Sequence, residues 1–309
     1  MVVRRRSSVE AIVGRPVLAA PQGKSGRLRP LSSTIGSTVR VADISTSREL
    51  LWNLTLRELR GKYKRSALGW AWSLLNPLST MAIYTFVFGV VLGGTSPVAM
   101  PNGKKIFALY LLCGLLPWNF LAQTTSGAMG AVIANGGLVK KVWFPREVLV
   151  FATAAAMLFG FLIEASILIV ALLIWGTMAL PWIPVLLVLT LFLGAMATGL
   201  GLMLAAANVY FRDLSYLWGI FLQLWFFGTP IVYPIVLVAR RLQGSRHWML
   251  TMYRANPMAL FVEAYRRCLY QSSWPTGLQV GSLAVISVAL LALGLWVFNR
   301  MSPRFAEEI

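Results

Sequence analysis

The sequence has few charged side chains and few of the side chains that carry catalysis or bind metals. Charged residues make up 12% of its 309 residues, with 10 Asp and Glu residues and a single His. Soluble domains usually carry about a quarter of their residues as charged ones. The acids form no obvious catalytic pair and no DxD site. The single His, His247, falls in a predicted outer loop, which makes a Ser/His/Asp constellation implausible, and one histidine excludes a histidine-ligated metal. We therefore expect no catalytic residues, no metal and no cofactor on this chain.

Cysteines and nucleotide-binding motifs are equally sparse. Cys113 and Cys268 stand alone, without the spacing of a disulfide framework or a zinc site. The stretch QGKS, residues 22–25, resembles the end of a phosphate-binding loop, but Leu18 stands where that motif requires glycine. The three arginines at positions 4–6 precede no apolar run, so neither a signal peptide nor a twin-arginine leader is predicted. We expect no nucleotide site on this chain.

Apolar residues and positive charge are what the sequence does contain. Hydrophobic residues make up 58% of the chain, the mean hydropathy is +0.70, and 28 Lys and Arg residues give a formal net charge of +18. This combination predicts a polytopic membrane protein with basic aqueous flanks. A nucleic-acid partner would also suit the charge, but a chain with so few polar residues cannot form a soluble binding domain. No nucleic acid is expected among its partners.

Six apolar runs are long enough to cross the hydrocarbon core of a membrane, which takes about 20 helical residues. The predicted fold class is therefore an all-α membrane protein with six transmembrane helices. The third and fourth runs are longer than a span requires, so we expect tilt or extension beyond the membrane. The predicted spans cover residues 74–92, 106–123, 148–175, 183–209, 216–238 and 278–298.

The spans imply four segments and one orientation. The segments are a flexible basic cytoplasmic tail (1–47), an amphipathic interface helix (48–73), the six-span domain (74–298) and a cytoplasmic C-terminal tail (299–309). An even number of spans puts both termini on one side, and most Lys and Arg residues then share that side. The positive-inside rule places both termini in the cytoplasm of a protein of the plasma membrane. The arginines between the fifth and sixth spans are the exception, because they fall outside.

Residues 49–65 combine an apolar stripe with positive charge. The stripe consists of Trp52, Leu56, Leu59 and Tyr63, and the cations are Arg57, Arg60, Lys62 and Lys64. The stripe is imperfect, since Leu50 and Leu54 fall on the charged side, and Glu58 is placed to pair with Lys62 one turn later. A basic amphipathic helix of this kind lies flat in the headgroup plane. Its cations either anchor the chain to anionic lipids or bind a specific anionic headgroup or a partner protein.

The turn GGLVKKVWFPRE, residues 136–147, separates the second and third spans. Its glycines favour a helix end, Lys140 and Lys141 suit a helix C-terminus, and Pro145 begins the next helix. We expect three apolar residues to face water or a docking partner: Val142, Trp143 and Phe144. The ordinary alternative for Trp143 is burial in the membrane interface.

Residues 256–270 are apolar enough to contact lipid but too short to span it. They predict short re-entrant or interfacial half-helices on the outer face before the last span, with Pro257 in a first turn. Backbone at membrane depth is tolerated where protein buries it or water lines it, so this segment suggests an exit vestibule. The alternative is an ordinary outer loop with one surface helix.

Aromatic residues gather in the first and fifth spans. The fifth contains LWFFGTPIVYP, residues 224–234, and the first contributes Tyr84, Phe86 and Phe88. Aromatic rings stack on the apolar faces of sugars, whereas a lipid-facing belt is the alternative. Small residues in the fourth span predict close helix packing. Glu164 is the only acid in the middle of a span; it is either functional or packed against a hydrogen-bond donor.

Four segments together resemble the permease subunits of ABC exporters for polysaccharides, the family that exports O-antigen, teichoic acid and mycobacterial galactan. They are RELRGKYKRSALGWAWSLLNPL (57–78), LVKKVWFPRE (138–147), NVYFRDL (208–214) and FFGTPIVYP (226–234). The resemblance runs from about residue 49 to the C-terminus. The basic tail before it is similar in length to that of actinobacterial members, which indicates galactan as the substrate.

The resemblance implies a homodimer above two copies of a separate ATPase, which would hold ATP and Mg²⁺. The interface helix and the turn after the second span would contact that ATPase. The ATPase-coupling residues it implies are Lys140, Lys141, Trp143, Phe144, Pro145, Arg146 and Glu147. The channel residues it implies for a polyprenyl-pyrophosphate-linked glycan are Tyr84, Phe88, Trp225, Phe226, Phe227 and Tyr233. Membrane lipids and the lipid-linked polysaccharide complete the expected partners, and the outer half-helices would gate the exit.

Two other classes of protein remain as alternatives. A membrane-embedded glycolipid-processing enzyme, such as a glycosyltransferase or a lipid phosphatase, would need paired acids or His/Arg clusters, which the sequence lacks. A secondary transporter or channel would need ionisable groups at the midplane or two repeated halves. Glu164 is the only such group in the sequence, and no repeat is evident.

Overall fold

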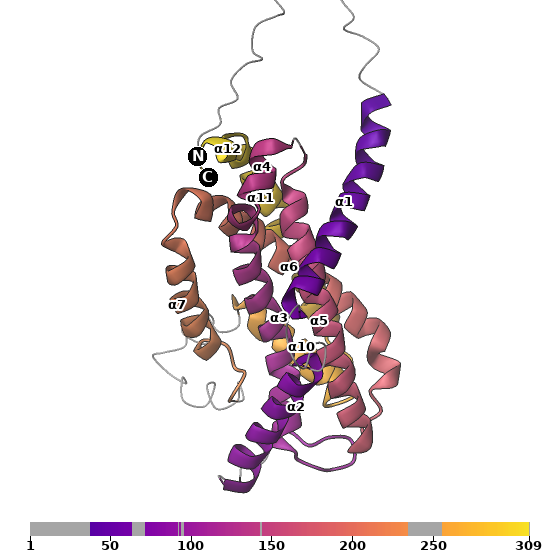
Figure 1. Ribbon diagram of the computed structural model, residues 1–309. Coiled ribbons are helices and arrows are strands. Elements are labelled where there is room, and N and C mark those ends of the chain that lie inside the picture. The colour runs from indigo at the N-terminus through magenta and orange to yellow at the C-terminus, as the bar shows by residue number, and fades with distance from the viewer. Residues whose placement is uncertain are drawn as a thin grey trace, which may run out of the picture. The chain divides into compact units, whose positions relative to one another are not determined.

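The computed structural model describes residues 38–63, 72–91, 93, 96–142, 144–233 and 255–308 (Figure 1). The chain divides into two units, residues 1–42 and 43–309, and the helix packing described below belongs to the second. Within the described residues every regular element is a helix, which confirms the predicted all-α fold class.

Proline and glycine residues mark some of the helix ends. The longer ones are α1 (Thr38–Tyr63), α2 (Trp72–Tyr84), α3 (Phe107–Ala134), α5 (Glu147–Ile174), α6 (Ile183–Tyr210), α7 (Leu214–Phe227), α10 (Pro257–Leu269) and α11 (Gly277–Met301). The shorter elements are the π-helix η2 (Thr85–Val91), α4 (Gly136–Lys141), η3 (Leu180–Trp182), η4 (Ser302–Arg304) and α12 (Phe305–Glu308). Pro257 occupies the first turn of α10, where a missing N–H costs nothing. Gly176, with φ of 88°, follows α5 in the left-handed conformation that glycine adopts readily.

Four of the six predicted spans are confirmed as helices long and apolar enough to cross a membrane. They are residues 107–134, 147–174, 180–210 and 277–304. The other two predictions correspond to shorter apolar helices: Leu78–Val91, within α2 and η2, and Leu214–Phe227, which is α7. The last five residues of the predicted fifth span, 234–238, lie outside the described residues. The count of six therefore stays a prediction.

Two helices extend beyond one of their predicted ends. Helix α1 begins at Thr38 instead of near residue 48, because no glycine or proline interrupts the chain between Gly36 and Gly61. Helix α3 continues to Ala134, although apolar residues alone set its predicted end at Gln123. Several small residues after Gln123 are buried where α3 packs on its neighbouring helices, namely Thr124, Thr125, Ala128 and Ala131.

Helix α6 packs closely against both α11 and α3. A Cβ atom added to Gly199 would overlap the backbone of Leu290 in α11, and one added to Gly294 would overlap the backbone of Gly199. A Cβ added to Gly201 would lie 2.7 Å from the Cβ of Ala128 in α3. The prediction that small residues of this span form a close packing surface is confirmed.

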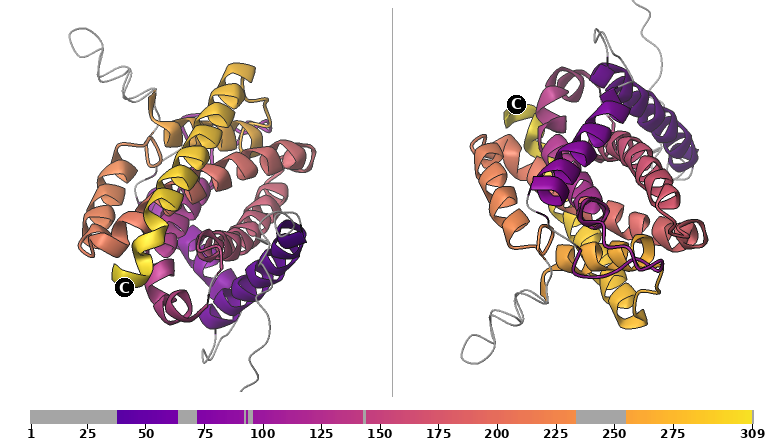
Figure 2. Two further views of the ribbon diagram at one scale, coloured as in Figure 1. Left: turned by 90° about the horizontal axis from the view of Figure 1, so that it is seen from above. Right: turned by 90° about the horizontal axis from the view of Figure 1, so that it is seen from below.

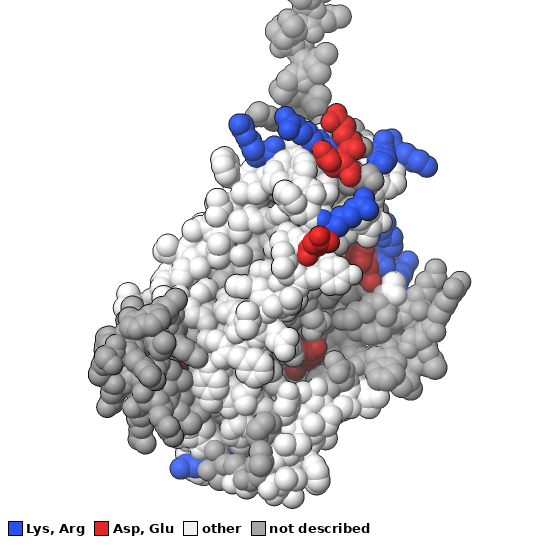
Figure 3. Space-filling view, turned by 90° about the vertical axis from the view of Figure 1, so that its left-hand side faces the viewer, with Lys and Arg blue, Asp and Glu red and all other residues white. Residues whose placement is uncertain are grey.

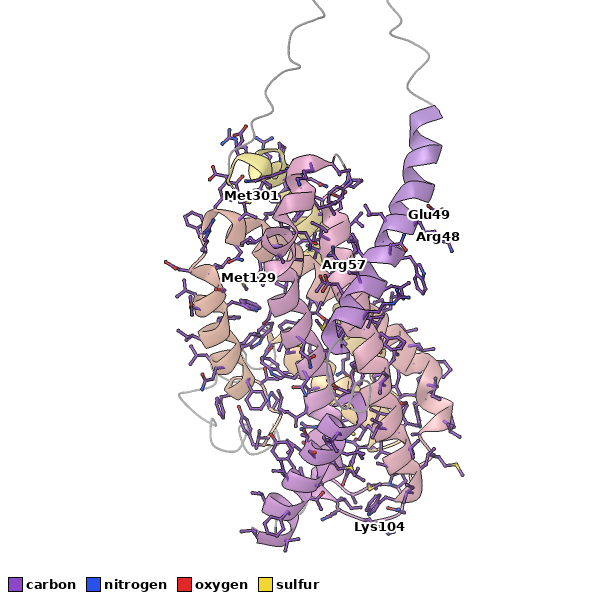
Figure 4. The ribbon with its side chains drawn as sticks, viewed as in Figure 1. Arg48, Glu49, Arg57, Lys104, Met129 and Met301 are labelled. Atoms are coloured by element: carbon purple, nitrogen blue, oxygen red, sulfur yellow. The ribbon has the colours of Figure 1, made fainter. Side chains whose placement is uncertain are left out.

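Charged residues lie mainly at one end of the bundle. Figure 3 shows Lys, Arg, Asp and Glu gathered at that end of the visible face and few of them over the surface below. Figure 4 places Met301, at the end of α11, near this charged end and Lys104 at the opposite end. An apolar surface between two polar ends is the pattern of a membrane-spanning bundle.

Two helices flank α3 on opposite sides. The end-on views of Figure 2 show α7 on one side of α3 and α1 on the other. Helix α7 packs on α3 and α6, whereas α2 packs on α5 and α3. The short helix α10 packs on α3, α6 and α11 at the end of the bundle opposite to α4 and α12. This arrangement places Trp225 and Phe226 of α7 against Trp118 of α3, and Trp218 against Thr125 further along α3.

Candidate functional site

A row of aromatic rings joins α7 to α3. Trp218 stacks on Phe221 with ring centroids 5.1 Å apart, and Phe221 lies 5.5 Å from Trp225. Trp118 of α3 contacts Trp225 edge-to-face at 5.7 Å and Phe226 at 5.5 Å. We call these five residues the aromatic row. Edge-to-face and offset contacts of this kind fix the orientation of each ring.

The outer side of α7 is open in the single chain. None of its residues is buried, and three large apolar side chains on it are strongly exposed: Leu217, Ile220 and Leu224. Trp225 and Phe226 are half-buried against α3, while Phe227 is 61% exposed and its backbone oxygen accepts a hydrogen bond from the Tyr233 hydroxyl. The structure therefore groups three of the four predicted channel residues of this segment around α7's C-terminal end and links the fourth, Tyr233, to them.

The channel residues predicted in the first span lie on another helix. Tyr84 is half-buried in α2, which borders α5 and α3. The side chain of Phe88 lies outside the described part of the structure. The two predicted groups thus occupy different helices, both of which border α3.

A pocket with both apolar and polar lining residues lies between α2, α3 and α5. Met81 and Leu168 are among its apolar lining residues, and the polar groups of Thr80, Asn119 and Glu164 share it. Glu164 is therefore next to other polar side chains and does not face lipid alone. Among the described residues no three metal-ligating side chains cluster, either here or elsewhere.

Asn256 connects the start of α10 to the end of α7. Its Oδ1 accepts hydrogen bonds from the Met258 backbone N–H and from the Trp225 indole Nε1, both at 3.0 Å. Its Nδ2 donates to the backbone oxygen of Gly228 at 3.2 Å and to Oγ1 of Thr229 at 3.0 Å. One amide side chain thus caps α10 and holds both the aromatic row and the turn that follows it.

Arg266 is a buried cation held by backbone oxygens. Its Nη1 donates to the Pro230 oxygen at 2.7 Å, its Nη2 donates to the Ile231 oxygen, and its Nε donates to the Tyr110 oxygen at 3.2 Å. Its guanidinium carbon lies 3.8 Å from the centroid of the Tyr110 ring. Burial lowers the pKa of Arg266, yet an arginine stays charged in proteins, so these oxygens and the ring must stabilise the charge.

Sequence reasoning did not separate Arg266 from the other arginines of this segment and assigned no role to Asn256. The sequence places all these arginines on the outer side without saying which are buried, and in the structure Arg266 is only 5% exposed. The helical period of the sequence does indicate that Arg266 is buried. Arg266 follows Val262 by four residues and precedes Leu269 by three, so it lies on the apolar face of α10. Gly114 makes room for it, because a Cβ there would lie 2.8 Å from Nη2.

Helix α10 is part of the protein core. Met258, Phe261 and Ala264 are fully buried, and the Tyr265 hydroxyl hydrogen-bonds Oγ1 of Thr190 in α6 at 2.8 Å. The predicted start of this helix at Pro257 is confirmed. The alternative of a simple surface helix does not fit this burial. Re-entry of α10 into the membrane remains a prediction.

The turn between α3 and α5 shows a mixture of exposed and buried residues. Lys140 and Lys141 are exposed at the end of α4, and Val142 is 53% exposed, as predicted. Trp143 lies outside the described residues. The prediction that Phe144 faces water or a partner is wrong, because this side chain is only 9% exposed. It belongs to a core cluster with Leu54 of α1 and with Val139, Val148, Phe298 and Phe305.

The C-terminal residues fold against this turn. Nη1 of Arg146 donates to the backbone oxygen of Ser302, and its guanidinium lies 6.0 Å from the centroid of the Phe305 ring. Phe305 is fully buried and contacts Phe298 edge-to-face at 5.3 Å. Pro145 and Glu147, also predicted for ATPase coupling, are half-buried beside Arg146. The segment predicted as a cytoplasmic tail is therefore a folded cap on the α4 end.

Helix α1 faces the protein with the leucines that disturbed its predicted stripe. Leu54 is buried and Leu50 is half-buried against the same cluster, while Trp52 of the stripe is 64% exposed. The two leucines thus lie on a second, protein-facing side of the helix. Their position explains why the amphipathic pattern is imperfect, because one period must serve two surfaces.

One cation of α1, Arg57, hydrogen-bonds the start of the turn between α3 and α5. Nη2 of Arg57 donates to Oδ1 of Asn135 at 2.5 Å and pairs with Glu58 at 3.2 Å (Figure 4). Arg60 is exposed, the side chain of Lys62 is not described, and Lys64 lies outside the described residues. The expected Glu58–Lys62 pair is therefore untested. Arg57 links α1 to the residue that joins α3 and α4.

Comparison with known proteins matches the part of the chain that contains the candidate site. The family model of ABC-2 type transporters matches residues 49–270, which include α4, α7 and α10. The O-antigen export system permease protein RfbA of Myxococcus xanthus is 31% identical over 272 residues, covering 87% of this chain and 98% of that protein. The protein of the same name from Klebsiella pneumoniae is 28% identical over 260 residues, covering 84% and 94%. The polysialic acid transport protein KpsM of Escherichia coli is 24% identical over 251 residues, covering 80% and 91%.

Proposed function

The chain belongs to the ABC-2 type transporter family, and we propose that it is the membrane-spanning permease subunit of an ATP-driven polysaccharide exporter. In this family the ATPase is a separate subunit. The observation that carries the proposal is the similarity to an O-antigen export permease over 98% of that protein's length and 87% of this chain. The relatives named for polysialic acid transport support the same class of cargo.

The ATPase side of the exporter is, in this proposal, the end that carries α4 and α12. Two copies of an ATPase would bind ATP and Mg²⁺ there and contact the exposed Lys140 and Lys141. Because α4 joins α3 to α5, a displacement of α4 reaches two core helices at once. Phe144 and Arg146 would transmit the displacement from inside the fold, since they are packed against the C-terminal cap.

The glycan path in this proposal follows the aromatic row. Aromatic rings offer apolar faces to sugar rings, and indole N–H groups donate hydrogen bonds. The exposed apolar side of α7 would be covered by a second copy of the chain, which makes the functional unit a homodimer. Tyr84 of α2 and the residues of α7 would then line one path. They would reach it either from two different subunits or, within one subunit, from two sides of α3.

The cargo we propose is a polysaccharide linked to a polyprenyl pyrophosphate, with a galactan precursor as the first candidate. Arg57 is bound to Asn135 beside α4, and Arg60 is exposed three residues further along α1, so a pyrophosphate group in the cytoplasmic leaflet would meet both cations. Each Lys or Arg near a membrane surface contributes about 1 kcal/mol of attraction for anionic lipid groups. Galactan is the first candidate because the segments 57–78, 138–147, 208–214 and 226–234 resemble a family that includes galactan exporters.

The experiment that tests the function is reconstitution. The chain is co-purified with candidate ATPase subunits, placed in proteoliposomes, and supplied with lipid-linked galactan or lipid-linked O-antigen. We expect ATP turnover of the ATPase to rise on assembly with the chain and galactan to become accessible to an enzyme outside the vesicle. Stable assembly with transport of neither glycan would refute polysaccharide export, and transport of O-antigen alone would refute the galactan assignment.

A topology measurement tests the orientation. Cysteines replacing Lys104 and Arg300 occupy exposed positions at opposite ends of the bundle, while the native Cys113 and Cys268 are buried. We expect an impermeant thiol reagent added to intact cells to label Lys104→Cys and to leave Arg300→Cys unlabelled until the cells are opened. The positive-inside rule gives this sign, because the α4 end carries most of the described cations. Labelling of Arg300→Cys alone would invert the orientation.

A further inference from the structure

Two polar side chains of α10 hold four consecutive residues at the end of α7. Asn256 donates to the Gly228 oxygen and to Thr229 Oγ1, and Arg266 donates to the oxygens of Pro230 and Ile231. The two side chains stand near the opposite ends of α10. We call these contacts the α10 clamp.

The clamp satisfies backbone groups that α7 cannot satisfy itself. Helix α7 ends at Phe227, so the oxygens of the following residues lose their helical partners. Thr229, Pro230 and Ile231 are nevertheless buried, and buried carbonyl oxygens need donors. The donors come from α10, and no side chain of α7 supplies them in the contacts the structure describes.

The clamp also sets the direction of the Trp225 indole. The same Oδ1 of Asn256 that caps α10 accepts the indole N–H at 3.0 Å, while Trp118 supports the ring from α3. The Thr229 hydroxyl donates back to the Trp225 oxygen at 2.8 Å. Trp225 is thus fixed through its ring, its backbone and the turn after it.

We propose that Asn256 and Arg266 are positioning residues that hold the end of α7 and aim Trp225 at the sugar rings of the passing glycan. This inference rests on the proposed export function. The clamp does not bind cargo, since Arg266 and the segment it holds are buried. It acts by keeping the part of the aromatic row next to α10 in one conformation, while the end of the bundle that carries α4 moves with the ATPase.

The structure offers an isosteric variant that opens the clamp without removing the cap. In Asn256→Asp the carboxylate oxygens still accept from the Met258 N–H and from the indole, and Asp is a good N-cap residue. The donor to Gly228 and Thr229 is lost, and a negative charge faces the Gly228 oxygen instead. Arg266→Lys keeps the charge but cannot reach three oxygens with a planar fork. Arg267→Gln is the matched control, because Arg267 pairs only with Glu263 at 2.6 Å among the contacts described.

The first measurement is export by the reconstituted complex as a function of lipid-linked glycan concentration. We expect Asn256→Asp and Arg266→Gln to lower the maximal export rate by about tenfold, which corresponds to losing one or two buried hydrogen bonds. The glycan concentration at half-maximal rate and the ATP turnover should stay within about twofold, because loading and ATPase docking take place at the other end. Arg266→Lys should recover part of the rate, and Arg267→Gln should match the wild type.

The second measurement does not depend on any substrate. Ile231 is fully buried, so a cysteine replacing it should react slowly with a small thiol reagent in the assembled complex. Adding Asn256→Asp or Arg266→Gln should speed this reaction by about tenfold, since local opening limits it. Adding Arg267→Gln should leave it unchanged.

The outcomes separate this inference from the proposed function. A wild-type complex that assembles but exports no glycan, with labelling that still depends on the clamp, would refute export and with it the role assigned to Trp225. A wild-type complex that exports, with Asn256→Asp equal to it in maximal rate or in labelling of residue 231, would refute the clamp. Should Arg266→Gln fail to fold, Asn256→Asp decides the matter alone, because its helix cap is retained.

Discussion

Reversing the two charges at the end of α4 should detach the ATPase. In the double variant Lys140→Glu and Lys141→Glu both replaced side chains are exposed, and within the described part of the chain no hydrogen bond or ion pair of theirs is lost. If they face acidic groups of the partner, like charges placed opposite one another cost about 3 kcal/mol, which is about a hundredfold in affinity. We expect the variant to insert and purify normally but to lose both ATPase co-purification and stimulated ATP turnover.

The chain contains its own control for this experiment. Lys104 and Lys105 are also consecutive, exposed lysines, but they precede α3 at the opposite end of the bundle. The double reversal Lys104→Glu and Lys105→Glu changes the net charge equally and should leave ATPase binding intact. Equal loss in both variants would indicate a general charge effect, and retention of the ATPase by the α4 variant would remove α4 from the docking surface.

Phe144 illustrates why the docking surface could not be read from the sequence. A phenylalanine next to charged residues predicts an exposed docking residue, and Phe144→Ala would then test docking directly. The side chain is instead buried in a cluster that includes Leu54 and Phe305, both far away in the sequence. Truncating a buried Phe typically costs about 3–5 kcal/mol of stability, so this variant would confuse unfolding with uncoupling. The exposed lysines give the cleaner measurement.

The sequence predicted those features of the fold that depend on residues close together in the chain. Long apolar runs predicted α3, α5, α6 and α11, and Pro257 predicted the start of α10. Small residues predicted the close packing of α6. Each of these features follows from composition or from a single helix period, which the sequence displays directly.

Features that depend on distant partners were not predictable in the same way. The burial of Arg266 requires the oxygens of Tyr110 and of the chain after α7, and the burial of Phe305 requires the α4 turn. Leu54 interrupts the predicted apolar stripe of α1 because its side chain lies on the side of that helix that packs against the protein. In each case a residue that breaks a local pattern marks a tertiary contact, and such contacts hold the candidate site together.

Adding one methyl group where α6 crosses α11 should destabilise the whole bundle. In Gly199→Ala the new Cβ would overlap backbone atoms of Leu290, and backbone atoms cannot rotate aside as a side chain can. Overpacking costs about 1–3 kcal/mol, and a clash with backbone belongs at the upper end or beyond. Gly294→Ala should behave similarly, because its Cβ would overlap the backbone of Gly199 on the facing helix. We expect both variants to unfold at markedly lower temperature in detergent, with little folded protein recovered from membranes.

Gly194 provides the matched control on the same helix. Nothing lies within 4 Å of a Cβ added there, so Gly194→Ala removes only the helix penalty of glycine and should stabilise α6 by up to about 1 kcal/mol. The thermal midpoint of the purified protein, followed by size-exclusion chromatography after heating, compares the three variants. A midpoint of Gly199→Ala equal to that of Gly194→Ala would mean that α6 and α11 do not cross at Gly199 and Gly294. The close packing that joins the last helix to the centre of the bundle would then have to be placed elsewhere.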